Sequence, residues 1–384
     1  MFMDITSTIK YIGVKDNDID LFEGQYRVPK GVLYNSYVIF DEKIAIMDTA
    51  DARKGAEWWN NLTSTLDGRT PDYLVVQHME PDHSSLIAEV MERFPSLKVV
   101  ASAIAIKMMP QFFSEPDFQS RTITVKGGDT LCLGSRELTF VAAPMVHWPE
   151  VILSYDNKEK VLFSADAFGT FGETIEEGWN DEARRYYLNI VGKYGTQVQT
   201  LLKKAATLDI ATICPLHGPV LKENLGRYIA LYDTWSSYRP ETEGVFVAYA
   251  SIYGGTAEVA LKIADTLRSL GVEIITADLA RCDASQALAD AFRMSRMVLC
   301  ASSYDAGVFP PMHHFLHHLK MKNFQNRRVA LVENGSWAPT AGRVMRSMLE
   351  EMKNIEIVEP VVTIKSRMKA EDAEAIEALV KSIQ

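Results

Sequence analysis

In the first part of the chain, apolar positions fall in short runs separated by polar residues, a pattern typical of strands joined by turns. A hairpin is predicted over residues 33–49, where two apolar stretches flank the polar turn 41–43. Residues 51–66 show the helical spacing of an amphipathic helix, and a second helix is predicted over 84–94. Further strands are predicted at 73–76, 98–102, 121–125, 136–142, 150–155 and 160–164. This order predicts a sandwich of two sheets flanked by helices.

The pattern changes after the Arg239-Pro240 pair and the polar stretch 241–244, which together indicate a linker. From there apolar strands and amphipathic helices alternate regularly. Strands are predicted at 245–250, 273–277, 297–301, 329–333 and 356–363, and helices at 257–270, 284–293, 311–321, 339–353 and 369–383. Five strands alternating with helices indicate a doubly wound parallel sheet. We therefore expect two domains, 1–243 and 244–384.

Composition narrows the functional classes. The 384 residues carry a net charge of −10, which argues against nucleic acid as a partner. The sequence contains no apolar run of about 18 residues and no recognisable signal peptide, so we expect no membrane span and no secretion. The four cysteines are scattered without a CxxC pair and are expected to be reduced thiols. These features favour a cytoplasmic location.

The stretch 77–85 is unusually rich in groups that can bind a metal. Directly after the predicted strand 73–76 it places His78, Glu80, Asp82 and His83 within six residues. Burying so many ionisable groups costs several kcal/mol, roughly, unless they are paired or coordinated. The alternative is an exposed turn in which these residues carry no function.

Three more candidate ligands follow predicted strands in the same way. His147 follows 136–142, Asp166 follows 160–164, and His217 follows an apolar run that ends at Cys214. Each alone is more often an ordinary loop residue, but strand ends that meet at one edge of a sheet bring such residues together. Four histidines and three carboxylates exceed the needs of one tetrahedral zinc, so two metals are indicated. Thiolate-free ligation of this kind suits iron, manganese or zinc.

In the second half, the turn 251–256 lies between a predicted strand and a predicted helix. It lacks a Walker lysine and the pattern G-x-G-x-x-G, but its glycines, hydroxyls and helix N-terminus suit one phosphate. Aromatic residues in later strand-end loops, Tyr304 and Trp337, are suited to stack on a flat ring. The alternative is a plain connection between strand and helix, with aromatics that cap the sheet.

Together, H-x-E-x-D-H and the later His, Asp and His resemble the metallo-β-lactamase-like fold. Hydrolases of that superfamily usually carry H-x-H-x-D-H, and the replacement of the second His by Glu80 is typical of flavodiiron proteins. The resemblance implies that His78, Glu80 and His147 bind one iron, that Asp82, His83 and His217 bind the other, and that Asp166 bridges them. Trp148 would then line the site or be a packed aromatic residue.

The second half resembles flavodoxin, whose fold flavodiiron proteins carry after the metal domain. The resemblance implies FMN. Its phosphate would contact Ser251, Tyr253, Gly254, Gly255 and Thr256, and its ring would contact Ser303, Tyr304, Asp305, Gly335, Ser336 and Trp337. The chain departs from the family pattern at Ser302, Asp305 and Ala306, where Pro and Asn would be expected. A carboxylate at Asp305 would disfavour the anionic reduced flavin.

The resemblance also implies an activity. Electrons would pass from FMN to a diiron site that reduces dioxygen to water, nitric oxide to nitrous oxide, or both. A head-to-tail homodimer, or a dimer of such dimers, would bring the FMN of one subunit to the iron of its partner. No rubredoxin module is evident, so rubredoxin or a flavin reductase would be a separate donor. Two other hypotheses remain: a binuclear zinc hydrolase fused to a flavodoxin-like module, and an electron carrier whose metal domain is a scaffold.

A histidine cluster in the predicted helix 311–321 needs a separate interpretation. His313, His314, His317 and His318 form pairs four residues apart, a spacing that can bind metal. No carboxylate accompanies them. We interpret the cluster as a solvated helix face with incidental affinity for divalent ions.

Overall fold

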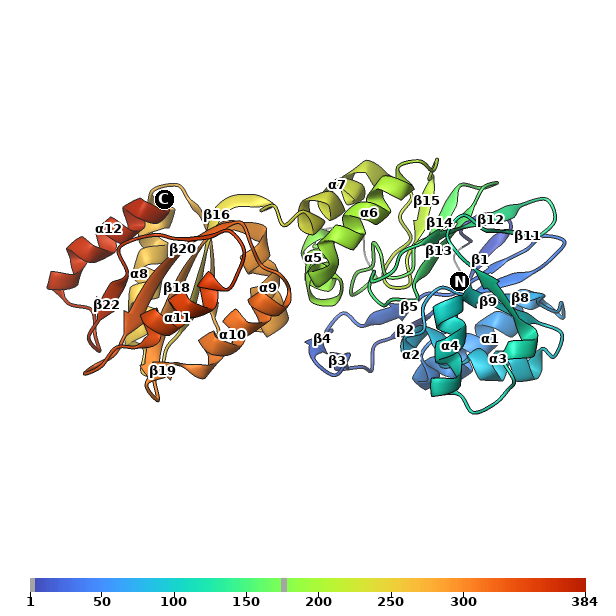
Figure 1. Ribbon diagram of the computed structural model, residues 1–384, viewed down its shortest axis with the longest axis horizontal. Helices are drawn as coiled ribbons and strands as arrows, with labels where there is room; N and C mark the ends of the chain where they lie inside the picture. Colours follow the sequence, from blue (N-terminus) through green and yellow to red (C-terminus); the bar gives the residue numbers. More distant parts are fainter. Residues whose placement is uncertain (1–3, 174–177) are drawn as a thin grey trace. The chain divides into compact units, whose positions relative to one another are not determined.

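The computed structural model describes residues 4–173 and 178–384, which form two compact units, Met1–Asp233 and Thr234–Gln384 (Figure 1). The division falls within helix α7 (Leu225–Ser236), earlier than the predicted linker at 239–244. Among the described residues, no helix is long and apolar enough to cross a membrane.

The first unit is built on two sheets. The six-stranded sheet has the order β1 (Ile9–Tyr11), β6 (Tyr37–Ile39), β7 (Ala45–Met47), β8 (Tyr73–Val76), β9 (Lys98–Ser102), β10 (Thr122–Val125). The five-stranded sheet has the order β11 (Thr130–Cys132), β12 (Glu137–Ala142), β13 (Ile152–Asp156), β14 (Val161–Phe163), β15 (Thr212–Cys214). One buried cluster contains Met47 and Val75 from the first sheet with Phe140 and Phe163 from the second. The two sheets therefore pack face to face, as predicted.

Helices cover the outer faces of this sandwich (Figure 1). They are α1 (Gly55–Leu66), α3 (Ile87–Arg93) and α4 (Ala103–Phe112) beside the six-stranded sheet, and α5 (Trp179–Ile190), α6 (Gly195–Ala205) and α7 beside the five-stranded one. Two small hairpin-like pairs complete the unit: β2 (Val14–Asp16) with β5 (Val32–Tyr34), and β3 (Leu21–Phe22) with β4 (Tyr26–Arg27). The predicted sandwich of sheets flanked by helices is confirmed.

Strand direction determines where the loops gather. Strands β7, β8, β9 and β10 run parallel, and so do β14 and β15. The carboxyl ends of parallel strands meet at the same edge of their sheet. The segment after β8, which carries His78, and the segment after β15, which carries His217, both begin at such an edge.

The second unit is a parallel sheet with helices on both faces (Figure 1). Its strand order is β17 (Glu273–Asp278), β16 (Thr242–Ala250), β18 (Met294–Tyr304), β20 (Arg327–Asn334), β21 (Ile355–Ile357), and β19 (Gly307–Val308) and β22 (Val362–Ile364) pair with β18 and β20. Its helices are α8 (Gly255–Ser269), α9 (Ala284–Arg293), α10 (Pro310–Met321), α11 (Ala341–Glu350) and α12 (Ala373–Ile383). Along β16, Val245 and Val247 face the cluster that contains residues of α8 and α12, whereas the ring of Phe246 approaches Phe315 of α10. This alternation explains the continuously apolar strand, because both faces are buried.

Some predictions were wrong in detail. The strand predicted at 356–363 is broken into β21 and β22, with Pro360 between them, because proline cannot donate a ladder hydrogen bond. The helix predicted at 84–94 is α3, which begins later, at Ile87, and a separate one-turn helix, α2 (Pro81–Ser84), precedes it. The hairpin predicted over 33–49 is narrower, with β6 and β7 as its strands, while β5 pairs with β2.

Candidate functional site

The structure brings all seven predicted metal ligands together in the first unit. They form two groups, and within each group one ligand atom per residue lies within 4.8 Å of the others: His78, Glu80, His147 and Asp166 in group A, and Asp82, His83 and His217 in group B. Six of the seven are buried, and Glu80 is partly exposed. The predicted clustering is therefore found, although each residue's role as a ligand remains a proposal.

A change of backbone conformation divides the first motif between the two groups. Glu80 is extended, with φ −61° and ψ 137°, and Pro81 then starts the short helix α2. Proline suits the first helical position because its φ is already helical and the missing N–H would be unpaired there. His78 and Glu80, which precede the helical turn, belong to group A, and Asp82 and His83, within the turn, belong to group B. Four ligands from six residues can thus face two positions.

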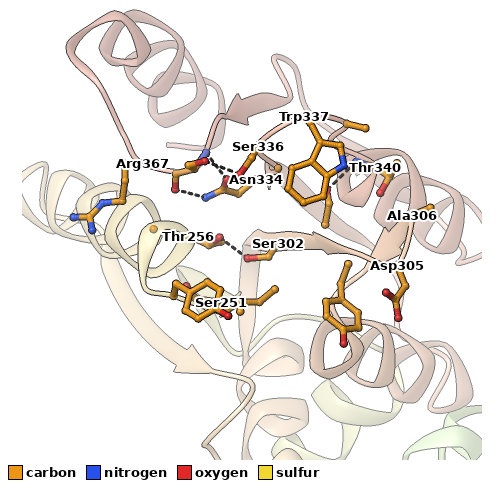
Figure 2. Close-up of a pocket in the computed structure, with 18 residues that line it drawn as sticks. Ser251, Thr256, Ser302, Asp305, Ala306, Asn334, Ser336, Trp337, Thr340 and Arg367 are labelled. Atoms are coloured by element: carbon orange, nitrogen blue, oxygen red, sulfur yellow. Dashed lines mark hydrogen bonds between the residues drawn. The ribbon is translucent and has the colours of Figure 1, made fainter.

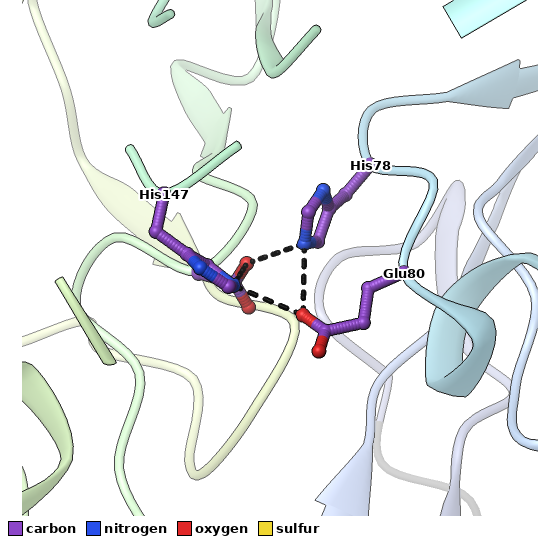
Figure 3. Close-up of side chains that lie close together, drawn as sticks. His78, Glu80 and His147 are labelled. Carbon is purple, nitrogen blue, oxygen red and sulfur yellow. Dashed lines mark hydrogen bonds and ion pairs between the residues drawn. The ribbon is translucent and has the colours of Figure 1, made fainter. Parts of the chain in front are cut away.

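Group A has the spacing of a coordination shell. Glu80 Oε2 lies 2.9 Å from His147 Nε2 and 3.2 Å from His78 Nε2, and the three side chains point toward one another (Figure 3). Asp166 Oδ2 lies 3.1 Å from His78 Nε2. Bonds of about 2.1 Å to one metal, at roughly right angles, would place neighbouring donor atoms about 3 Å apart. The observed distances fit one ion in this position.

Group B is arranged around a second position. His83 Nε2 and His217 Nε2 are 2.9 Å apart, and His217 Nε2 lies 3.2 Å from Asp82 Oδ2. Asp166 Oδ1 is 3.7 Å from the same nitrogen of His217, so the Asp166 carboxylate faces both groups. Two imidazole nitrogens that face each other so closely are readily explained by a shared cation.

Unsatisfied oxygens support a cation at both positions. Within the described residues, both carboxylate oxygens of Asp82 and Oδ2 of Asp166 are buried without a hydrogen bond, although imidazole nitrogens approach Asp82 Oδ2 and Asp166 Oδ2. A buried charged oxygen without a hydrogen bond is costly, unless a positive charge compensates it. The donor set thus fits the two metals that the sequence predicts.

Neighbouring groups orient two of the histidines. His78 Nδ1 donates to Glu150 Oε1 at 2.8 Å, and His217 Nδ1 donates to the carbonyl oxygen of Leu33 at 2.8 Å. Because these acceptors hold the proton on Nδ1, the lone pair on Nε2 faces the cluster, as metal ligation requires. The carbonyl of Leu33 carries no charge, whereas the carboxyl group of Glu150 can carry a full one.

The electrostatic environment differs between residues of the cluster. Burial, followed by repulsion from His217 and His78, holds the pKa of His83 well below its usual value, so this ring stays neutral. Burial alone would raise the pKa of Glu80, but hydrogen bonds with His147 and His78 outweigh it and lower that pKa. Burial likewise opposes ionisation of Glu150, and its bond with His78 reverses the effect.

Several residues around the cluster were not predicted from the sequence. The hydroxyl of Tyr186 donates to Asp166 Oδ1 at 3.0 Å, and the ring of Phe22 lies edge-on to His217 with centroids 5.2 Å apart. A cavity of about 320 Å³ reaches Glu80 and Asp82 and is also lined by Phe22 and Tyr34. Nothing local in the sequence marks these residues, since they come from strands β3 and β5 and helix α5, far from the motif.

The sequence left two interpretations of Trp148: a residue that lines the metal site, or a packed aromatic residue. Its ring lies edge-on to His78, with centroids 5.2 Å apart, and 6.1 Å from His147. It therefore contacts two members of group A and helps to fix their rings.

The second unit contains a cavity of about 420 Å³ at the carboxyl ends of its strands (Figure 2). Of the eleven predicted flavin contacts, ten line it: Ser251, Tyr253, Gly255, Thr256, Ser303, Tyr304, Asp305, Gly335, Ser336 and Trp337. Gly254 is not among the lining residues. The cavity is also lined by residues that were not predicted as contacts: Ile252, Ser302, Ala306, Asn334, Ala338, Thr340, Ser366 and Arg367.

Gly254 instead shapes the start of α8. Its φ of 88° is left-handed, which glycine adopts without strain, and it is the residue that precedes the helix. At Gly255, a Cβ atom would lie only 2.1 Å from the carbonyl oxygen of Ser366. Glycine is therefore favoured at 254 by the turn, and it is required at 255 for close packing of the helix start against the loop 365–367.

The two ends of this cavity differ in charge. Arg367 lies near Ser251 and Thr256 at the N-terminus of α8, and Asp305 lies at the opposite end (Figure 2). A helix N-terminus attracts anions, so the Arg367 end suits a phosphate. Of the two aromatic residues singled out in the sequence, Trp337 is 91% exposed and Tyr304 46%, so neither is buried against the sheet and both are available to cover a flat ring. This donor set and shape fit the predicted FMN.

The histidine cluster lies on α10. His313, His314 and His317 are exposed, and the rings of His314 and His318 have centroids 4.2 Å apart. Partial burial, followed by repulsion from His314, His317 and Lys322, lowers the pKa of His318. The exposed side chains agree with the predicted solvated helix face.

Comparisons with known proteins place the chain among several relatives. Residues 32–218 match the family model described as ODP family beta lactamase. The chain is 34% identical to diflavin flavoprotein A 2 of Synechocystis over 80% of its own length and 53% of that protein, so it spans about half of this relative. It is 28% identical to the anaerobic nitric oxide reductase flavorubredoxin of Aeromonas hydrophila over 90% of its length and 72% of that protein. Rubredoxin oxygen:oxidoreductase of Desulfovibrio gigas superimposes with a TM-score of 0.93 at 26% identity, covering 100% of this chain and 98% of that one.

Proposed function

The chain belongs to the flavodiiron protein family, and on this premise we propose that it is an oxidoreductase that reduces dioxygen to water, nitric oxide to nitrous oxide, or both. The observation that carries the proposal is the seven-residue cluster with Glu80 where hydrolases of the superfamily usually have a histidine. A flavin-sized cavity in the second unit supports it.

Group A would hold one iron and group B the other, with the Asp166 carboxylate shared between them. When bound, the two irons would bind the diatomic substrate, stabilise the charge that develops on it and deliver electrons supplied by FMN. The remaining contributions come from the chain itself. Tyr186 orients Asp166 through its hydrogen bond, and Glu150 and Leu33 fix the rings of His78 and His217.

The cavity beside the cluster is large enough to admit a diatomic gas. Its lining mixes apolar side chains such as Phe22 with charged ones such as Asp51 and Arg53, so the lining does not itself select an apolar substrate. Tyr34 lines the same cavity, and its hydroxyl accepts a hydrogen bond from Arg53 Nη2 at 2.9 Å. Burial raises the pKa of Tyr34, so this hydroxyl keeps its proton.

In the second unit, FMN would place its phosphate near Ser251, Thr256 and Arg367 and its ring between Tyr304 and Trp337. We propose that rubredoxin or a flavin reductase supplies the electrons. We also propose a head-to-tail homodimer, alone or paired into a tetramer, in which the FMN of one chain serves the iron of another. The names of two relatives, rubredoxin oxygen:oxidoreductase and flavorubredoxin, are the support for such a donor.

The test begins with protein purified without added metal and without oxygen. Two irons and one FMN per chain are expected, followed by consumption of dioxygen or nitric oxide when a reduced donor is added. Rates measured with each gas separately would decide the preference between them. Two zincs with little iron would instead favour a binuclear hydrolase, and iron and flavin without gas consumption would favour an electron carrier.

A further inference from the structure

Glu150 is a buried carboxylate that contacts the metal cluster without belonging to it. Its Oε1 accepts hydrogen bonds from His78 Nδ1 at 2.8 Å and from the backbone N–H of Met79 at 2.9 Å. Its side chain and that of His78 are both 0% exposed. Glu150 follows the His147 loop and reaches across to the β8 loop, so one carboxylate fixes both the ring and the backbone of the first motif.

The second oxygen of Glu150 lacks any such partner. Among the described residues, Oε2 is buried without a hydrogen bond, although Glu150 borders a cavity of about 430 Å³. Apolar residues dominate the lining, among them Ile104, Pro144 and Val151, while Lys126 and Asp129 also line it. In apolar surroundings a charge is weakly screened, so its effect on His78 is large.

The two groups of the cluster are otherwise closely matched. Group A has the carboxylate of Glu80, group B has that of Asp82, and both share Asp166. Their outer partners differ. In group A, His78 donates to an anionic carboxylate, whereas in group B, His217 donates to the neutral carbonyl of Leu33, and Nδ1 of His83 has no hydrogen bond within the described residues.

A carboxylate that accepts the Nδ1–H of a ligating imidazole makes that imidazole a stronger electron donor, which favours the higher oxidation state of the metal it binds. We propose that Glu150 is a positioning residue that makes the two iron positions unequal, so that the iron held by group A is the harder of the two to reduce. This inference rests on the proposed diiron function. It predicts that the first electron entering the diferric site converts the group B iron to ferrous iron.

The test uses iron- and flavin-loaded protein carrying Glu150→Gln. Glutamine keeps the shape and one acceptor oxygen but removes the charge. The matched control is Asp72→Asn, because Asp72 is a half-buried carboxylate of the same unit that accepts from the backbone N–H of Ile44 at 2.9 Å and from Lys43 Nζ at 3.0 Å, and neither partner is a cluster residue. Anaerobic reductive titration followed by Mössbauer spectroscopy would measure the two iron potentials, and a chelator challenge would measure the release of each iron.

With the original chain and the Asp72→Asn control, we expect two resolved reduction steps. In Glu150→Gln the lower potential should rise, the gap between the steps should narrow, and the signal of one iron should change while the other stays constant. One of the two irons should also leave to the chelator about 10–100-fold faster, the usual effect of losing such an outer partner.

Unchanged potentials and equal release rates in a Glu150→Gln protein that retains both irons would overturn the inference. Release of both irons at the same increased rate would also overturn it, because an effect confined to group A should release the group A iron before the group B iron. Loss of only one iron would support it. If the original chain binds no pair of irons, the proposed function itself fails, which is a distinct outcome.

Discussion

The metal cluster and the flavin-sized cavity are built in opposite ways. In the cluster, His78 and His83 are buried and are held by other protein groups on nearly every side. In the cavity, Trp337 and Tyr253 stand almost fully exposed on loops after the strands. The first site is assembled by the fold and depends on charge compensation, whereas the second offers surfaces that only a bound ring would cover. Substitutions should therefore affect metal content at the first site and ligand affinity at the second.

The strongest test of this contrast is Asp166→Ala. Because its two oxygens face both groups, its loss should remove both irons and abolish gas reduction. Iron per chain and oxygen or nitric oxide consumption are the measurements. Ser164→Ala is the control, since Ser164 lies on the same loop but donates to the carbonyl of Ala167. Retention of two irons by Asp166→Ala would show that the carboxylate does not join the two positions.

A pair of glycine substitutions tests the start of α8. Gly254→Ala has open space around its new methyl group and should cost only the left-handed strain, about 1 kcal/mol of unfolding free energy. Gly255→Ala would collide with the backbone of Ser366 and should cost about 3 kcal/mol and weaken FMN binding. Denaturant unfolding and flavin titration of both variants are the measurements. Equal losses of unfolding free energy in the two variants would mean that the loop 365–367 moves readily to make room for the new methyl group.

Trp337→Ala tests the exposed side of the contrast. Loss of stacking on the flavin should cost about 1–3 kcal/mol of binding free energy, by analogy with bases stacked on aromatic side chains. The unfolding temperature of the flavin-free protein and its iron content should not change. Leu261→Ala, on the exposed face of α8 outside the cavity, is the control. A lower unfolding temperature without loss of FMN affinity would indicate that Trp337 is structural.

The smallest effect on iron content and activity is expected from substitutions on α10. Replacement of His313, His314, His317 and His318 by alanine should leave the iron content and the gas reduction unchanged, because these rings lie in the second unit on an exposed helix face. Elemental analysis of protein purified without affinity resins would measure this. A fall in iron would assign the cluster a part in metal supply.

The sequence predicted those parts of the fold whose burial follows a simple period. Strand β8 is a four-residue apolar run, β16 is apolar over the predicted part 245–250, and helix α9 was predicted with its observed bounds. Helix α5 was not predicted because it buries polar residues, among them Arg184, Arg185 and Asn189, which a pattern of apolar positions assigns to the surface. Strands β3 and β4 have two residues each, too few to show a period.

The site was predicted to a similar degree and for similar reasons. The seven cluster residues were found because each follows an apolar strand or belongs to the dense first motif. Glu150 and Tyr186 were missed because their contacts join positions 72 and 20 residues apart. Arg367 was missed because the loop 365–367 has neither the glycines nor the aromatic residues that marked the other loops of the cavity. The spacing of residues along the chain does not record contacts of this kind.

The one-turn helix α2 also limits how the gene can change. Each residue added to a helix rotates the following side chains by about 100°, so an inserted or deleted codon between Pro81 and His83 would turn Asp82 or His83 away from the cluster. The residues before Glu80 would keep their places, leaving half a site. Point substitutions can therefore adjust this motif gradually, whereas an insertion or deletion within it should abolish the second metal position.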